Sequence, residues 1–199
     1  MTVIRLGDGR LVLHSPVPIT PELRRELDAL GPVGFIVVPE AHGAFAGPAT
    51  RSFPSAELLA APSPPRRRRS LPFHASLADR PPAAWAGQVE SLLVQGFRLH
   101  EVVLFHRSSR TLVLTDLCFN IHRSESPLAR LFFRANGMWR RFGPSRIIRG
   151  LAVSDRSALR QSLERLLEWD FDRIVPGHGD VIENRGPAAL RAAWLRGFQ

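Results

Sequence analysis

The segment Pro176–Asp180 holds the residue types best suited to chemistry in this sequence. It consists of Pro-Gly-His-Gly-Asp and directly follows a short apolar run that ends at Val175. The two glycines allow a sharp backbone turn that brings the imidazole of His178 close to another group. Neutral imidazole is a common metal ligand. Two interpretations are open from this segment alone: a metal ligand, or a turn histidine that bonds to the backbone.

Two further potential ligands follow apolar runs elsewhere in the chain. Asp116 comes directly after residues 111–115, and His42 follows residues 35–38. If these runs are neighbouring strands of one sheet, their ends bring His42, Asp116 and His178 together at one edge. Two histidines and one carboxylate are able to hold Zn²⁺ or Fe²⁺ with coordination positions left open.

The hydrophobic pattern predicts that strands and helices surround these residues. Apolar runs predict strands at residues 3–6, 10–14, 35–38, 58–61, 89–94, 101–105, 111–115 and 173–175, and a loop at 39–47. Helical spacing predicts helices at residues 21–30, 125–140, 155–167 and 187–195. Thr20 and Ser154 are the expected N-caps of the first and third of these helices.

One face of the predicted helix at 125–140 is apolar. Its members recur at helical spacing, and they are Leu128, Leu131, Phe132 and Ala135. A face of this kind usually packs on the core while arginines coat the outer side, and we expect that here. Contact with a membrane and closure over a pocket are the alternatives.

Length and composition indicate one globular domain over residues 1–199, with a Pro/Arg-rich connection at about 62–82. No apolar run approaches the roughly 18 residues of a transmembrane helix. The first residues lack the pattern of a secretory signal, and Cys118 is the single cysteine. A reducing, cytoplasmic location is therefore expected.

The net charge of +9 raises the question of nucleic-acid binding. All 27 basic residues are arginine, and they are spread along the chain apart from the run Arg66–Arg69. Prolines flank that run, which favours a solvated loop. No stripe of basic residues interleaved with aromatic side chains accompanies it. Nucleic-acid binding is therefore not expected.

The order of a strand-end histidine, a strand-end aspartate and a late Pro-Gly-His-Gly resembles the metallo-β-lactamase superfamily. The segment 101–117 also resembles an uncharacterised bacterial branch of it. The resemblance covers nearly the whole chain. It implies an α/β fold, an αβ/βα four-layer sandwich of two mixed sheets flanked by helices, with a site at the edge that the sheets share.

The main motif of the superfamily, His-x-His-x-Asp-His, falls on residues 40–45. Only His42 matches it, because Glu40, Ala44 and Phe45 replace the other ligands. Asp116 matches the bridging aspartate and His178 the last histidine. The remaining histidine of the family falls near Phe97, and His100 is a displaced substitute. The resemblance thus implies a site that has lost much of its two-metal cage.

The implied metal ligands are His42, Asp116 and His178, with Glu40 and His100 as further candidates. His14, Phe45 and Cys118 are the candidate lining of the pocket, although for a lone strand cysteine buried packing is the alternative. The expected cofactor is none, or one Zn or Fe ion. No catalytic residue is assigned.

Two hypotheses for function follow. The first is a non-catalytic derivative that binds a small molecule or a protein partner. The second is a hydrolase with one metal, acting on a small or acidic substrate, because a metal ion lowers the pKa of its bound water to about 7. The lost ligand positions favour the first.

Overall fold

The computed structural model describes residues 1–40, 43, 45–62 and 73–195, and its strands form two mixed sheets. The first sheet has the order β1-β2-β3-β4-β5, formed by Thr2–Arg5, Leu11–His14, Val33–Val38, Glu57–Ala60 and Ala75–Ser76. The second has the order β6-β7-β8-β9, formed by Val89–Leu93, Val102–His106, Thr111–Val113 and Arg173–Val175. β1 and β2 are antiparallel, as are β6, β7 and β8, whereas the other neighbours are parallel.

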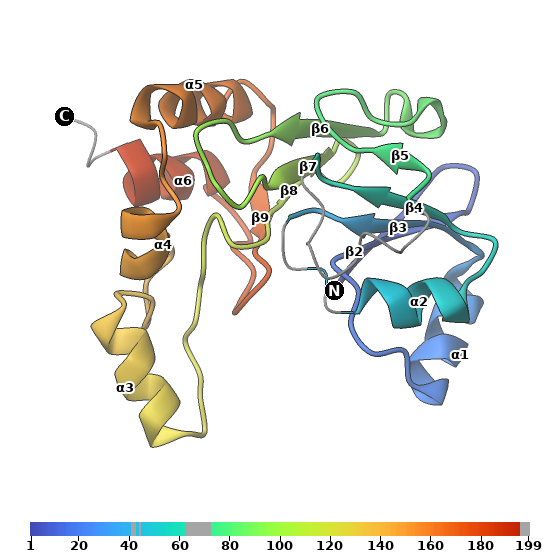
Figure 1. The fold of residues 1–199 in the computed structure, drawn as a ribbon, viewed down its shortest axis with the longest axis horizontal. Helices are drawn as coiled ribbons and strands as arrows, with labels where there is room; N and C mark the ends of the chain where they lie inside the picture. The colour runs from blue at the N-terminus through green and yellow to red at the C-terminus, as the bar shows by residue number, and fades with distance from the viewer. Residues whose placement is uncertain (41–42, 44, 63–72, 196–199) are drawn as a thin grey trace.

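Helices lie outside the two sheets. They are α1 (Pro21–Leu30), α2 (Ala46–Ser52), α3 (Pro127–Ala135), α4 (Arg146–Leu151), α5 (Arg156–Leu166) and α6 (Gly186–Trp194), with a short 3-10 turn η2 (Ala83–Trp85) before β6. α1 and α2 lie beside the first sheet, and α5 and α6 beside the second (Figure 1). This is the αβ/βα sandwich that the resemblance to the superfamily implies.

Strand β3 and the first four residues of β7 contain only apolar residues and glycine, because both of their faces are covered. Phe35 and Val37 of β3 belong to the cluster between the sheets, where Val102 and Leu104 of β7 also lie. The alternate residues of β3 pack with α1 and α2, and those of β7 pack with α5 and α6. Trp85 of η2 meets the ring of Phe35 edge-on at 5.4 Å in the cluster between the sheets.

Several boundaries differ from the predictions. Thr20 caps α1 as expected, but the cap of α5 is Asp155, whose side chain accepts a hydrogen bond from the Ala158 N–H at 3.0 Å. The predicted cap, Ser154, lies one residue before the observed cap. α2 begins at Ala46, inside the predicted loop, and the predicted helix at 125–140 ends at Ala135, with α4 following as a separate helix.

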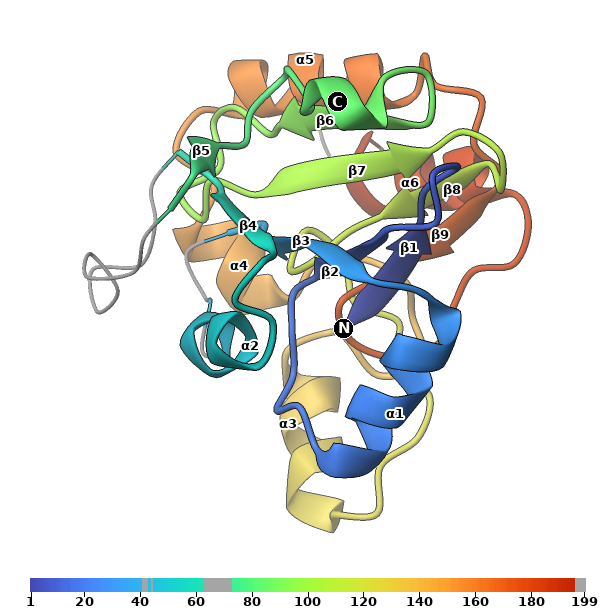
Figure 2. The ribbon, with the colours of Figure 1, turned by 90° about the vertical axis from the view of Figure 1, so that its right-hand side faces the viewer.

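The apolar face of α3 does not pack on the core, contrary to the prediction. Leu128 is 79% exposed, Leu131 65% and Phe132 51%. Phe133 on another side of the helix instead packs against a small cluster of Phe119, Ile121 and Met138. In both views α3 lies at the lower end of the molecule, away from both sheets (Figures 1 and 2).

Candidate functional site

The two sheets are joined at one edge, where β3 ends and β7 begins. The backbone N–H of Val102 donates to the carbonyl of Pro39 at 2.7 Å. Glu40 and Glu101, the neighbours of these two residues, are both buried, at 2% and 0% exposure. Two acidic side chains therefore lie at the shared edge, where the resemblance places the site.

Glu101 holds the loop that follows β8. Its Oε1 accepts a hydrogen bond from the Thr115 N–H at 2.7 Å. Its Oε2 accepts from the N–H groups of Asp116 at 2.9 Å and Leu117 at 2.7 Å. Three consecutive amides thus converge on one carboxyl group, which fixes the backbone that carries Asp116.

The structure brings His178 and Asp116 together. Strands β8 and β9 are parallel neighbours, with Val113 beside Val175, so the segments that follow them emerge at the same edge. The Nε2 of His178 lies 3.5 Å from Oδ1 of Asp116. The imidazole also stacks on Phe119, with ring centroids 5.6 Å apart and planes at 9°. The His178 side chain is 62% exposed, so it remains accessible to a ligand.

Gly179 allows this turn to pass close to the segment after β8. Its φ is +99°, and a Cβ built there would lie 2.1 Å from the Asn120 carbonyl oxygen. The Asn120 N–H donates to the His178 carbonyl at 3.1 Å, and the Asp180 N–H donates to the Asn120 carbonyl at 2.8 Å. Glycine is needed because this close approach and the left-handed backbone both exclude a side chain.

The buried carboxyl groups keep their protons to unusually high pH. Burial, followed by the charges of Glu101 and Asp116, raises the pKa of Glu40 to about 10. Burial also raises the pKa of Glu101 to about 8, while its three backbone hydrogen bonds act in the opposite direction. Crowded carboxyl groups in a low dielectric favour their neutral form. At neutral pH this edge therefore carries less negative charge than its residue types suggest.

Raising the pH is expected to destabilise protein from which metal has been removed by a chelator. Both carboxyl groups are protonated in the folded chain at pH values where the unfolded chain, with an ordinary pKa of 4.5, has lost those protons. The unfolded state then binds fewer protons, so the free energy of unfolding falls as the pH rises from about 5 towards 10. Urea titrations at about pH 6 and about pH 9 measure the change.

The variant Glu40→Gln is the control for this pH dependence, because an amide has a similar shape and does not ionise. Its free energy of unfolding is expected to fall less between the two pH values than that of the wild type. A wild-type protein that is equally stable at both values contradicts the prediction.

The other predicted site residues lie in varied surroundings. His42 is outside the described residues. His100 is exposed, with φ at +52°, and Phe45 is 40% exposed. Cys118 is fully buried in the cluster of the second sheet, where burial raises the pKa of its thiol.

His14 ends β2 and is buried, at 1% exposure. Burial and the charge of the chain's amino terminus lower the pKa of His14 to about 3, so its imidazole is neutral. Its Nε2 has no hydrogen-bond partner within the described part of the chain. It is therefore a neutral, buried ring at a strand end.

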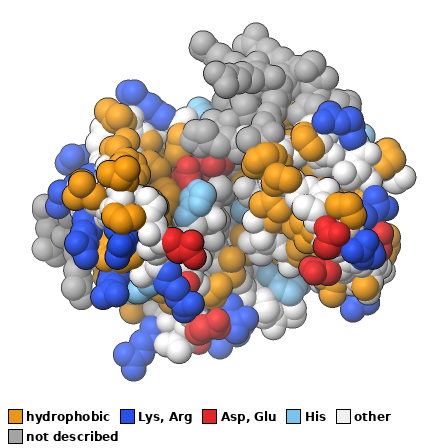
Figure 3. Space-filling view, turned by 90° about the horizontal axis from the view of Figure 1, so that it is seen from below, with side chains coloured by type: hydrophobic (Ala, Val, Ile, Leu, Met, Phe, Trp, Pro, Cys, Tyr) orange, Lys and Arg blue, Asp and Glu red, His pale blue; other side chains and the backbone are white. Residues whose placement is uncertain are grey.

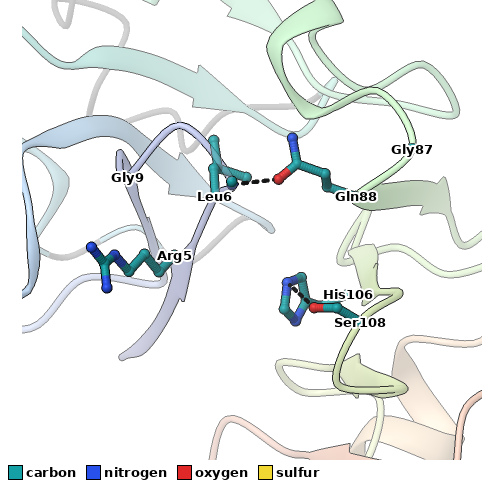
Figure 4. A pocket seen from close by; sticks show the side chains of 8 residues that line it. Arg5, Leu6, Gly9, Gly87, Gln88, His106 and Ser108 are labelled. Carbon is teal, nitrogen blue, oxygen red and sulfur yellow. Dashed lines mark hydrogen bonds between the residues drawn. The ribbon is translucent and has the colours of Figure 1, made fainter.

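A cavity of about 400 Å³ lies at the other end of β7. Gly7 and Gly9 of the first turn line it, together with Gln88 and His106 (Figure 4). Gln88 accepts a hydrogen bond from the Gly7 N–H, and His106 bonds to the hydroxyl groups of Ser108 and Ser109. Because Glu101 precedes β7 and His106 ends it, this cavity is separate from the edge that holds Asp116.

Within residues 1–40, 43, 45–62 and 73–195, no three His, Cys, Asp or Glu side chains form a group suited to a metal ion. Asp116 and His178 supply a pair. Both oxygens of Glu101 already accept backbone hydrogen bonds. Acidic and histidine side chains are visible in the middle of the face shown in Figure 3, between two more hydrophobic flanks.

Sequence reasoning missed Glu101. It stands as the first residue of a predicted strand, a place where a polar side chain usually meets solvent. The signal that it offered was an acidic residue beside an apolar run in the segment that resembles the superfamily. Its partners, residues 115–117, reach it only through the β7–β8 hairpin.

Comparison with solved structures gives the same architecture. A metallo-β-lactamase from Pontibacter korlensis matches with a TM-score of 0.61 and 15% identity, over 97% of this chain and 85% of that chain. The metallo-β-lactamase FIM-1 from Pseudomonas aeruginosa, in its mono-zinc form, has a TM-score of 0.61 and 13% identity, over 98% and 82%. TTHA1623 in a di-iron-bound form has a TM-score of 0.57 and 18% identity, over 97% and 91%.

These likenesses show the fold, which is that of the metallo-β-lactamases. The structure describes no helix long and apolar enough to cross a membrane.

A comparison with curated proteins finds no match. A family model described as "Domain of unknown function (DUF4336)" matches residues 1–138. The chain therefore belongs to the DUF4336 family, and its fold is that of the metallo-β-lactamases.

Proposed function

We propose that this protein is a non-catalytic derivative of the metallo-β-lactamase fold that binds a ligand at the edge shared by its two sheets. One observation carries the proposal: at this edge Asp116 and His178 approach each other, but among the described residues no third His, Cys, Asp or Glu completes a group suited to a metal ion. Ala44 and Phe45 stand where the family's motif has two further ligands. A two-metal centre that activates water would therefore lack two of its ligands.

The chemistry of the edge indicates the kind of ligand. Asp116, whose side chain is 14% exposed, is an acceptor beside the accessible imidazole of His178, and the buried Glu40 keeps its proton at neutral pH because its pKa is raised to about 10. Phe119 adds an aromatic surface behind the imidazole. A small polar molecule, or a polar side chain of a protein partner, with both donor and acceptor groups fits this set.

Metal content is the decisive measurement. Protein purified without chelators is expected to hold substoichiometric Zn and Fe by elemental analysis, and to remain so after incubation with either ion and desalting. One tightly held ion per chain, together with turnover of a generic ester or phosphodiester that disappears in His178→Ala, would overturn the proposal.

Replacing His178 by alanine is expected to lower the free energy of unfolding by less than about 1 kcal/mol, because the side chain is mostly exposed and its contact with Asp116 is long. Urea denaturation measures the change. His122→Ala is the matched control, since His122 is another exposed histidine, bonded to Asn120. A loss far larger than in the control means that His178 holds something essential to the fold, as a metal ligand does.

The second candidate, a hydrolase with one metal ion, is favoured by the separation of that same pair. Two ligands of one tetrahedral Zn²⁺ lie about 3.4 Å apart, and Nε2 of His178 lies 3.5 Å from Oδ1 of Asp116. In this hypothesis Asp116 and His178 bind the ion with His42 and Glu40. The ion would supply a bound water with a lowered pKa. The elemental analysis described above tests this hypothesis, because it measures whether the ion is bound.

A further inference from the structure

The surface formed by α3 and α4 is unusually apolar. Five of the eight large apolar side chains that are exposed in the described chain belong to it: Leu128, Leu131 and Phe132 of α3, and Ile147 and Leu151 of α4. Leu151 is 71% exposed and Ile147 47%. Hydrophobic side chains gather at the left of Figure 3, where arginines surround them. Exposed apolar groups concentrated in this way mark an interaction site.

The charge of this surface is almost entirely positive. Residues 123–151 contain seven arginines and one glutamate, hence a net charge of +6 out of the chain's +9. The arginines are Arg123, Arg130, Arg134, Arg140, Arg141, Arg146 and Arg149. In the part of the chain that the structure describes, none of them forms an ion pair, whereas Arg107, Arg110 and Arg165 elsewhere do. Arg134 and Arg140 lie over the ring of Trp139 instead. The surface is therefore strongly positive, and a negatively charged partner would complement it.

A hollow on α3 has the lining that a phosphate group requires. It has a volume of about 290 Å³, and Pro127, Arg130, Leu131 and Arg134 line it. Arg130 and Arg134 are one helical turn apart, so their guanidinium groups lie on the same side of the helix. Guanidinium groups bind phosphate oxygens through paired hydrogen bonds. Leu131 adds an apolar wall beside the charged one.

The helix is already formed and fixed in place. Ser126 caps α3 by accepting a hydrogen bond from the Ala129 N–H at 3.2 Å, and Pro127 occupies its first turn. Arg146 bonds to the carbonyl of Ala135 through its side chain and to that of Asn136 through its backbone N–H. Phe133 anchors the inner side. No folding cost therefore opposes binding by the outer side.

We propose that the α3–α4 surface docks on the surface of an anionic phospholipid bilayer. The apolar side chains of α3 enter the headgroup region, the arginines meet the negative surface, and the hollow at Arg130 and Arg134 holds a lipid phosphate. This inference is independent of the proposed function, because it rests on other residues. A second copy of the chain fits less well, because a two-fold symmetric contact would set these arginines against each other.

Flotation with lipid vesicles tests the proposal. The wild-type protein is expected to float with vesicles of phosphatidylcholine and phosphatidylglycerol, and to stay behind with vesicles of phosphatidylcholine alone. The pair Arg130→Gln and Arg134→Gln is expected to weaken binding to the anionic vesicles on the order of tenfold. The pair Leu128→Ser and Leu131→Ser is expected to weaken it to a similar degree.

Matched controls separate this surface from general effects. Arg156→Gln with Arg191→Gln removes the same charge from exposed positions on α5 and α6, and Leu30→Ser removes one exposed leucine from α1. Both controls are expected to bind like the wild type, and circular dichroism checks that each variant is folded. The proposal is overturned if the wild type does not float with anionic vesicles, or if the controls weaken binding as much as the α3 variants. A dimer in light scattering that Leu128→Ser disperses, without vesicle binding, assigns the surface to a second copy instead.

Discussion

Replacing Glu101 by alanine is expected to lower the free energy of unfolding by about 3–5 kcal/mol. The substitution leaves the N–H groups of Thr115, Asp116 and Leu117 without their acceptor, around a Glu101 side chain that has no exposure to solvent. A buried donor that loses its partner costs far more than the net contribution of the bond. The urea midpoint and slope measure the loss.

Two variants sharpen this prediction. Glu90→Ala removes a carboxylate that pairs with Arg107 near the surface, and a cost below about 1 kcal/mol is expected there. Glu101→Gln keeps the shape but turns an NH₂ group towards backbone donors, so it is expected to fall between the alanine variant and the wild type. If Glu101→Ala costs no more than Glu90→Ala, the carboxyl group does not hold the Asp116 loop.

Substitution of Gly179 by alanine is expected to cost about 2–4 kcal/mol and to displace the His178 turn. The new Cβ would lie 2.1 Å from the carbonyl oxygen of Asn120 and 2.3 Å from its carbon, and a backbone group cannot rotate away as a side chain can. Urea denaturation reports the cost. Loss of the upfield shift that the Phe119 ring imposes on the His178 protons, followed by NMR, reports the displacement.

Gly9 supplies the matched control for this substitution. Its φ of +87° is close to the +99° of Gly179, yet a Cβ at Gly9 would meet no atom within 4 Å. Gly9→Ala therefore suffers only the strain of a left-handed backbone, about 1–2 kcal/mol. The difference between the two variants measures the close approach itself, and equal costs would show that the segments separate freely.

The strands and helices were open to prediction because they depend on local patterns, and the resemblance to the superfamily implied their arrangement in layers. Continuous apolar runs at β3 and β7 reveal strands covered on both faces, and Thr20 followed by Pro21 marks the start of α1. The meeting of Asp116 and His178 follows from strand ends that share an edge, and the structure places them 3.5 Å apart. These inferences need only the spacing of residue types.

The environment of α3 was beyond such reasoning. Helical spacing shows that Leu128, Leu131 and Phe132 share a face, but it does not show what covers that face. Phe133 takes the inward position because Ile121 and Met138 arrive from other segments to meet it. The role of Glu101 is likewise set by distant amides that reach it through the fold.

The burial of Cys118 makes its labelling rate a measure of local opening of the fold. Its thiol must lose a proton to react, and it lies in an apolar interior where burial raises its pKa and where Trp194 of α6 contacts it. A thiol reagent reaches the sulfur only when the helix and the sheet separate for a moment. Since the sequence contains no other cysteine, the labelling rate of the native protein reports one event. That event is the transient separation of α6 from the second sheet.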